Sequence, residues 1–277
     1  MQVHSIISDT ITPEIRLKGH QSIRFAPDGF SVLVSNASYR PYFLNSYLYP
    51  DAVSLHLLPR ECERILSEMD LISFEGETVF IVDSQAVTLV PEKLFEETLA
   101  GEMLRRACAF PGTDRVCSRL LKDRPLVLVY AVPEEIALLG SSFHAEVKIL
   151  HTLECLISLS DQVRASDHQR GVILAEIQPY TMDILVIMGD GIRLTNHYPL
   201  KDPSDFIYHT LNTMRQLDLD REKIPVYLSG IIHREHELFG LLGKYVRNVN
   251  TTPYFLEELS RTDTLRAMIL SEGSKCA

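Results

Sequence analysis

The chain has 277 residues, with 27 Lys or Arg against 37 Asp or Glu, so its formal net charge is −10. An acidic chain repels phosphate backbones, and its most basic stretch, residues 115–124, follows Asp114 and is interrupted by Asp123, so we expect no nucleic-acid partner. Only 13 residues are glycine, which leaves little material for the glycine-rich loops that bind phosphates.

The N-terminal segment, residues 1–9, has no basic region followed by a long apolar one. The longest apolar run, residues 126–132, is far shorter than the ~20 residues that a membrane helix needs. The five cysteines are widely spaced and form no CxxC motif. We therefore expect a reduced, cytoplasmic protein without membrane insertion, disulfides or a structural zinc site.

In the first half, apolar runs alternate with turn residues, as in Pro27-Asp28-Gly29 between two apolar segments. Pro91 is expected to open an amphipathic helix, and the valine-rich run at 126–132 is typical of a strand buried on both faces. The expected elements, in chain order, are strands at 22–25, 30–34 and 42–49, a helix over 53–69, a hairpin of 78–82 with 87–90, the helix from Pro91 with the stripe Phe95, Leu99, Met103 and Ala107, a strand at 126–132, a helix to 139, a strand at 145–150 and a helix over 152–159.

The pattern restarts near Gly171. Each half is then interpreted as a three-strand meander, a helix, a buried strand, a helix and a closing strand, which indicates a duplicated α/β architecture with mixed sheets. We expect one domain over residues 1–168, with an extra piece around 54–124, and a second over 169–277. The elements expected in the second half are strands at 172–177, 183–188 and 192–198, a helix after 202, a strand at 226–228, a helix near 235–242 and a strand near 245–249.

This order resembles the actin-like ATPase superfamily, whose members pair two ribonuclease-H-like domains around a nucleotide cleft. Residues 175–187 look like the second phosphate hairpin of that family, usually Val-Asp-Ile-Gly-Gly-Gly-Thr-Thr-Asp, and residues 226–232 are similar to its adenosine-side strand. Residues 126–159 resemble the end of the first domain in bacterial pilus-assembly and secretion members. An uncharacterised Bacteroidetes family of this fold is also similar. The resemblance implies an actin-like α/β fold of two ribonuclease-H-like domains with mixed sheets flanked by helices.

The resemblance also implies ATP and Mg²⁺ as cofactors, held by Glu176, Thr181, Asp183 and Gly230. The glycines of the hairpin are, however, replaced by residues 178–180, Gln-Pro-Tyr, and proline has no N–H to donate. In the first hairpin, the positions of a Mg²⁺-organising Asp and a Gly fall near Phe25 and Ala26, which are apolar. A working ATPase needs its donors placed within tenths of an ångström.

We therefore expect a non-catalytic interaction or assembly protein with a degenerate nucleotide cleft, no catalytic residues, no bound cofactor and a protein partner of unknown identity. The alternative is a nucleotide-binding ATPase or small-molecule kinase that uses the four residues named above. A third possibility is metal-dependent hydrolysis through His233 and His236, although no third ligand is marked by spacing. The tyrosines at 39, 42, 47 and 49 fit either a partner surface or half-buried strands.

Overall fold

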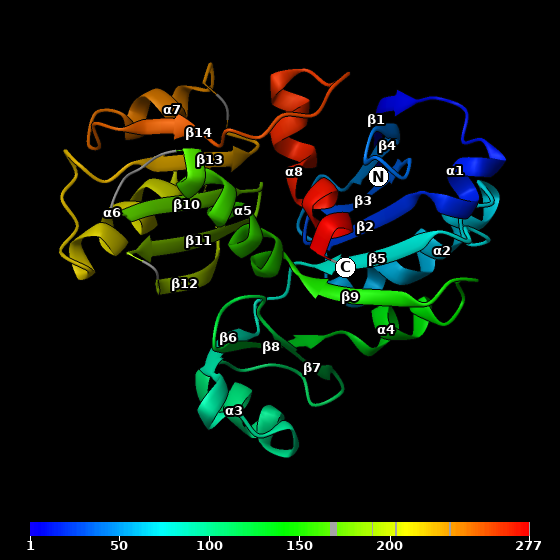
Figure 1. Ribbon diagram of the computed structural model, residues 1–277, viewed down its shortest axis with the longest axis horizontal. Helices are drawn as coiled ribbons and strands as arrows, with labels where there is room; N and C mark the ends of the chain where they lie inside the picture. Colours follow the sequence, from blue (N-terminus) through cyan, green and yellow to red (C-terminus); the bar gives the residue numbers. More distant parts are fainter. Residues whose placement is uncertain (167–170, 190, 203, 233, 277) are drawn as a thin grey trace. The chain divides into compact units, whose positions relative to one another are not determined.

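The computed structural model describes residues 1–166, 171–189, 191–202, 204–232 and 234–276. The chain forms two compact units (Figure 1), residues 1–154 with 273–277 and residues 155–272, and each is described by itself. The domain boundary expected between residues 168 and 169 lies outside the described residues and stays a prediction. None of the described helices has both the length and the apolar character needed to cross a membrane.

The first unit is built on a six-stranded mixed sheet of order β1-β4-β3-β2-β5-β9. Strands β2, β3 and β4 form the expected antiparallel meander, while β5 runs parallel to β2 and β9 runs parallel to β5. Helices α1, α2 and α4 belong to the same unit. The bounds are β1 (Gln2–Ser8), α1 (Pro13–Lys18), β2 (His20–Ala26), β3 (Gly29–Ser35), β4 (Pro41–Leu48), α2 (Leu58–Glu68), β5 (Glu77–Val82), α4 (Glu134–Gly140) and β9 (Val147–His151).

The core beside the six-stranded sheet is aromatic. Phe80 of β5 meets Phe25 of β2 edge-on, with ring centroids 5.3 Å apart, and Phe143 in the same manner at 5.2 Å. All three side chains are buried. Burial of such rings is a large apolar contribution to stability, and it holds β5 in its place between β2 and β9.

A separate three-stranded sheet of order β6-β8-β7 is inserted between β5 and α4. One of its faces is covered by α3, whose Ala100 and Leu104 pack with Val127 and Val129 of β8. On β8 the Tyr130 hydroxyl donates to the carbonyl of Ile149 at 2.8 Å, which ties the insert to β9. The bounds are β6 (Val87–Pro91), α3 (Ala100–Ala107), β7 (Arg115–Leu120) and β8 (Leu126–Val132).

Two expectations for this region are wrong. The segments 78–82 and 87–90 do not form a hairpin, because β5 pairs with β2 and β9 while β6 pairs with β8. The inserted sheet spans 87–132, and α2, which falls in the extra piece expected around 54–124, is the crossover helix between β4 and β5. The helix expected from Pro91 begins only at Ala100, and Leu99 is exposed instead of lying on a buried stripe.

Arg119 of β7 is not a freely solvated cation. Its Nε lies 2.8 Å from Oε1 of Glu154, in the first turn of α5 (Thr152–Ser166), and its Nη2 donates to the carbonyl of Cys276 at 3.3 Å. The Glu154 side chain is only 11% exposed. Burial raises the pKa of Glu154 to about 7, although Arg119 acts in the opposite direction.

This burial predicts a pH dependence of stability. The pKa of Glu154 is about 7 in the folded chain and near 4.5 when exposed, so the folded state holds this proton more tightly and loses stability as the pH rises from 4.5 to 7. Glu154→Gln should therefore match the parent near pH 4.5 and be more stable at pH 8, by at most about 3 kcal/mol. Urea unfolding at the two pH values measures the difference. Exposed Glu146→Gln is the control, and equal curves for Glu154→Gln and the parent at pH 8 would refute the prediction.

The second unit holds a five-stranded mixed sheet of order β12-β11-β10-β13-β14. This order repeats β4-β3-β2-β5-β9 strand for strand, including the parallel pairing of the last three strands, so the expected duplication is confirmed. Residues of α6 and α7 pack on one face of the sheet. The bounds are β10 (Gly171–Ile177), β11 (Thr181–Met188), β12 (Gly191–Pro199), α6 (Asp205–Gln216), β13 (Val226–Gly230), α7 (Glu237–Leu242), β14 (Val249–Thr251) and α8 (Arg261–Cys276), whose end belongs to the first unit.

Candidate functional site

The second unit brings the four predicted site residues to one end of its sheet. Glu176 of β10 faces Asp183 across the β10–β11 ladder, and it faces Ser229 across the parallel β10–β13 ladder. Thr181 opens β11 and Gly230 closes β13, opposite Ile177. Glu176, Thr181 and Asp183 are all almost completely buried.

The turn between β10 and β11 is closed by its own groups. The N–H of Gln178 donates to the carbonyl of Thr181 at 2.9 Å, and the carbonyl of Tyr180 accepts from the N–H of Leu200 at 2.7 Å. The side-chain amide of Gln178, itself buried, donates to the carboxylate of Glu176. Pro179 has no N–H. The turn is thus stabilised by protein groups in the position where a phosphate hairpin offers free backbone donors.

Gly230 is required by the backbone of the sheet. Its φ is +82°, and a Cβ at this position would lie 2.0 Å from the carbonyl oxygen of Ile177. The N–H of the following residue, Ile231, donates to that same carbonyl at 2.8 Å. Close backbone approach accounts for this glycine without any ligand.

Asp183 has a partner that the sequence analysis missed. Its Oδ1 lies 3.0 Å from Nδ1 of His197 in β12, and both side chains are 1% exposed. The two residues face each other in the β11–β12 ladder. The available signal was a histidine two residues before the end of a polar strand. Without the strand register, that signal does not show that His197 lies opposite Asp183.

In the first unit, the strand that leads into the corresponding turn, β2, ends in two apolar residues. Phe25 and Ala26 are buried in the core, as their side chains suggest. Asp28 has a backbone role, since its carbonyl accepts from the N–H of Tyr49 at 2.9 Å. Burial raises the pKa of the Asp28 carboxyl; Arg24 acts against this shift and Asp83 adds to it.

Arg24 is a second residue that the sequence analysis missed. Its Nη2 donates to Oδ2 of Asp83 at 3.2 Å, and both side chains are buried. Asp83 follows β5 directly and its N–H donates to the carbonyl of Phe25 at 2.9 Å. A guanidinium stays charged even when it is buried. Arg24 therefore supplies the positive charge that balances the carboxylates near this turn. The signal was a single arginine within an apolar strand.

Both turns can be compared with the needs of a nucleoside triphosphate and its Mg²⁺. Each lacks the run of glycines that brings backbone N–H groups to phosphates. The turn after β10 is closed by its own hydrogen bonds, and near the turn after β2 the guanidinium of Arg24 already pairs with Asp83. The residues present do not fit an ATP–Mg²⁺ site of the usual kind.

The remaining candidates also have structural roles or lie elsewhere. His233 lies outside the described residues, and His236 caps α7 by accepting from the N–H of Leu238 at 3.2 Å. Tyr47 is buried and stacks on Phe30 at 4.7 Å, whereas the tyrosines at 39, 42 and 49 are half-buried. The tyrosine segment is thus a half-buried strand region and offers no broad exposed aromatic surface.

Solved structures define the class of the protein. A protein of unknown function with an actin-like ATPase fold from Bacteroides thetaiotaomicron matches with a TM-score of 0.74 and 19% identity, over 95% of this chain and 98% of that one. PilM in the PilM–PilN type IV pilus biogenesis complex matches at 0.61 and 15%, over 95% and 98%. The ethanolamine utilization protein EutJ from Carboxydothermus hydrogenoformans matches at 0.53 and 9%, over 98% and 93%. The chain therefore has the actin-like ATPase fold.

The family follows from the sequence itself. Residues 8–249 match the model of the family described as protein of unknown function, DUF3822, and the chain belongs to that family. No curated protein matches the chain in sequence.

Proposed function

We propose that this protein is a non-catalytic interaction or assembly protein that keeps the actin-like fold with a degenerate nucleotide site. The observation that carries the proposal is the turn after β10, where Gln178 bonds both Glu176 and the backbone of Thr181. Opening this turn for a phosphate would break those bonds and leave buried polar groups unpaired, at roughly 1–3 kcal/mol each.

An open strand edge supports an interaction role. β1 is an outer strand of the six-stranded sheet and most of its residues are exposed. Of the described outer strands with five or more residues, β1 is the one with no Lys, Arg, Asp, Glu or Pro. Charges, prolines and β-bulges are what normally prevent an edge from pairing, and of these β1 has only a register shift between Ser5 and Ile7. We infer that the partner is a protein that adds an extended segment to β1.

The likeness to PilM is consistent with such a role. That protein is known in a complex with PilN. For the present chain, the partner stays unidentified and is expected to be a protein rather than nucleic acid, given the net charge of −10. A cytoplasmic location belongs to the same proposal, since none of the five cysteines forms a disulfide.

The first experiment is a thermal-shift titration of the full chain with MgATP and MgADP. A ligand that binds only the folded state raises the melting temperature with its occupancy. We expect no Mg²⁺-dependent shift at millimolar nucleotide and no release of phosphate above a no-protein blank. Saturable stabilisation or steady hydrolysis would instead favour the alternative, an ATPase or small-molecule kinase, for which the gathering of Glu176, Thr181, Asp183 and Gly230 at one sheet end is the supporting observation.

The β1 surface is tested by introducing the charge it lacks. The test variant is Val3→Lys/Ser5→Lys, in which Val3 is 58% exposed. The matched control is Leu120→Lys, at a position that is 57% exposed. Recovery of the partner from an extract should fall at least tenfold for Val3→Lys/Ser5→Lys, while the control should recover it as the parent does. Slower amide exchange of β1 in the recovered complex should accompany binding. Equal recovery by both variants would place the partner elsewhere.

A further inference from the structure

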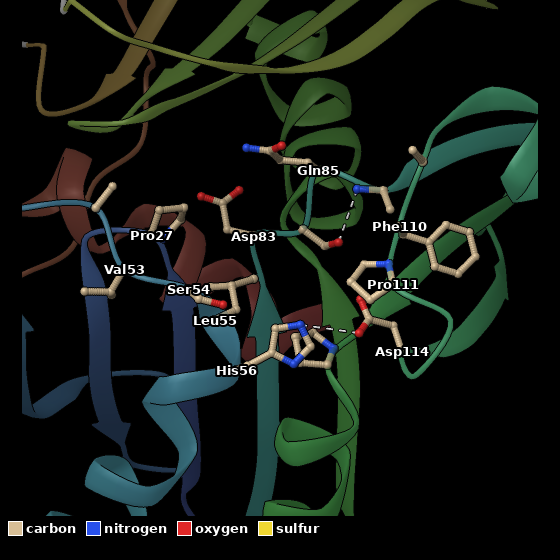
Figure 2. Close-up of a pocket in the computed structure, with 15 residues that line it drawn as sticks. Pro27, Val53, Ser54, Leu55, His56, Asp83, Gln85, Phe110, Pro111 and Asp114 are labelled. Carbon is tan, nitrogen blue, oxygen red and sulfur yellow. Dashed lines mark hydrogen bonds and ion pairs between the residues drawn. The ribbon is translucent and has the colours of Figure 1, made fainter.

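The first unit contains a pocket of about 380 Å³ at the carboxyl end of β5 (Figure 2). The turn after β2, the segment before α2, the residues after β5, the loop before β7 and the start of α4 all contribute to its wall. The volume lies within the usual range for small-molecule sites, roughly 300–1,000 Å³. Carboxyl ends of parallel strands are also where α/β sheets commonly bind ligands.

Most of the wall is apolar and stiff. Three prolines line it, and Val53, Leu55 and Phe110 complete a surface suited to a hydrocarbon body. Prolines lose little conformational entropy when a ligand binds, so this surface is preorganised.

The polar part of the wall favours a cation. The lining residues include Asp83 and Asp114 but no Lys or Arg. Asp83 is already paired with Arg24. Asp114 is different: its side chain is only 7% exposed, and no hydrogen bond from the described residues reaches its Oδ1. The imidazole of His56 lies nearby, with its Nε2 3.5 Å from that oxygen.

His56 does not satisfy Asp114, because its Nε2 at 3.5 Å is too far for a normal hydrogen bond and its other nitrogen, Nδ1, lies 2.9 Å from Oε2 of Glu135. Burial raises the pKa of Asp114; His56 lowers it and Glu135 raises it further. A carboxylate so enclosed is stabilised by a donor that approaches closer than 3.5 Å. An anionic ligand would meet Asp114 and Asp83 without a cation in the lining to balance it.

We propose that this pocket binds a small organic ammonium ion, a protonated primary or secondary amine on a compact hydrocarbon body. The ammonium donates to Oδ1 of Asp114, and the hydrocarbon packs against Leu55, Phe110 and the prolines. The residues that line this pocket include none from the turn after β10 and none from β1, so the proposal stands whether or not the proposed interaction role does.

The test compares the binding of charged amines with that of neutral alcohols of nearly the same shape. Protonated cyclohexylmethylamine and 2-phenylethylamine are titrated against the full chain at pH 7.5 by calorimetry, beside cyclohexylmethanol and 2-phenylethanol. We expect at least one amine to bind, and its alcohol to bind at least tenfold more weakly. If neither amine binds, or if each alcohol binds as well as its amine, the proposal is overturned.

Variants locate the binding. Asp114→Asn should weaken the amine at least tenfold with an unchanged melting temperature, whereas Asp123→Asn, at an exposed position of positive φ that Asn tolerates, should have no effect. Ala109→Trp, which fills the exposed mouth of the pocket, should abolish binding independently of charge. Unchanged affinity in both Asp114→Asn and Ala109→Trp would show that the amine binds elsewhere and would reject this site.

Discussion

Gly230→Ala is expected to destabilise the chain by about 3 kcal/mol or more. The new Cβ would lie 2.0 Å from the carbonyl oxygen of Ile177, and the φ of +82° is itself unfavourable for alanine. Since the obstacle is backbone within the sheet, it cannot move aside without breaking the β10–β13 ladder. Urea unfolding measures the loss.

Gly240→Ala is the control for this substitution and should have the opposite sign. Gly240 lies within α7, and a Cβ there would have no neighbour within 4 Å. Alanine in a helix is favoured over glycine by roughly 0.5–1 kcal/mol. If Gly230→Ala were as stable as the parent, the close approach to Ile177 would not explain this glycine. That result would support a role of Gly230 in binding a ligand.

Asp183→Ala is the second variant with a large expected effect. Its carboxylate and the imidazole of His197 are buried together at 3.0 Å, and removing one member of a buried pair costs roughly 3–5 kcal/mol. We expect a loss in this range by urea unfolding. Asp183→Asn should cost less, because the amide oxygen can still accept a hydrogen bond from the ring.

A double-mutant cycle separates this structural role from a nucleotide-binding one. Asp183→Ala/His197→Ala should be less destabilising than the sum of the two single changes, since the second change removes the unpaired partner. In the same samples, MgATP should alter the melting temperature of neither variant nor parent. Additive losses, together with a nucleotide effect that disappears in Asp183→Ala, would contradict the proposed function.

The sequence predicted the repeat but misplaced one strand of it. Residues 78–82 and 126–132 are both continuous apolar runs, and apolar runs of this length indicate burial without saying in which sheet. The pattern predicts the longer run for the main sheet, yet β8 is the central strand of the insert, between α3 and β9, whereas β5 pairs with β2 and β9. Long-range strand pairing decides which of two buried strands belongs to a sheet, and the local sequence pattern contains no information about that pairing.

The candidate site was predictable in part for the same reason. Glu176, Thr181 and Asp183 fall on a recognisable hairpin, so their proximity follows from the strand pattern. The roles of Arg24 and His197 depend on partners 59 and 14 positions away in the chain. The pattern does not predict β1, α1 or α8. β1 is too exposed to show an apolar face, and in α8 the apolar and polar residues are mixed around the helix, so that no apolar face stands out.

The end of α8 has a consequence for biosynthesis. Residues 273–276 belong to the first unit, where the hydroxyls of Ser22 and Ser274 lie 2.5 Å apart and Arg119 bonds the carbonyl of Cys276. During translation, these residues emerge only after the whole of the second unit has been made. The unit that begins first is therefore the one completed last, and a nascent chain lacks the partner of its buried Ser22 and one of the partners of Arg119 until the end of α8 is made. Ribosome-stalled chains ending near residue 154 should accordingly be far more open to protease than the finished protein.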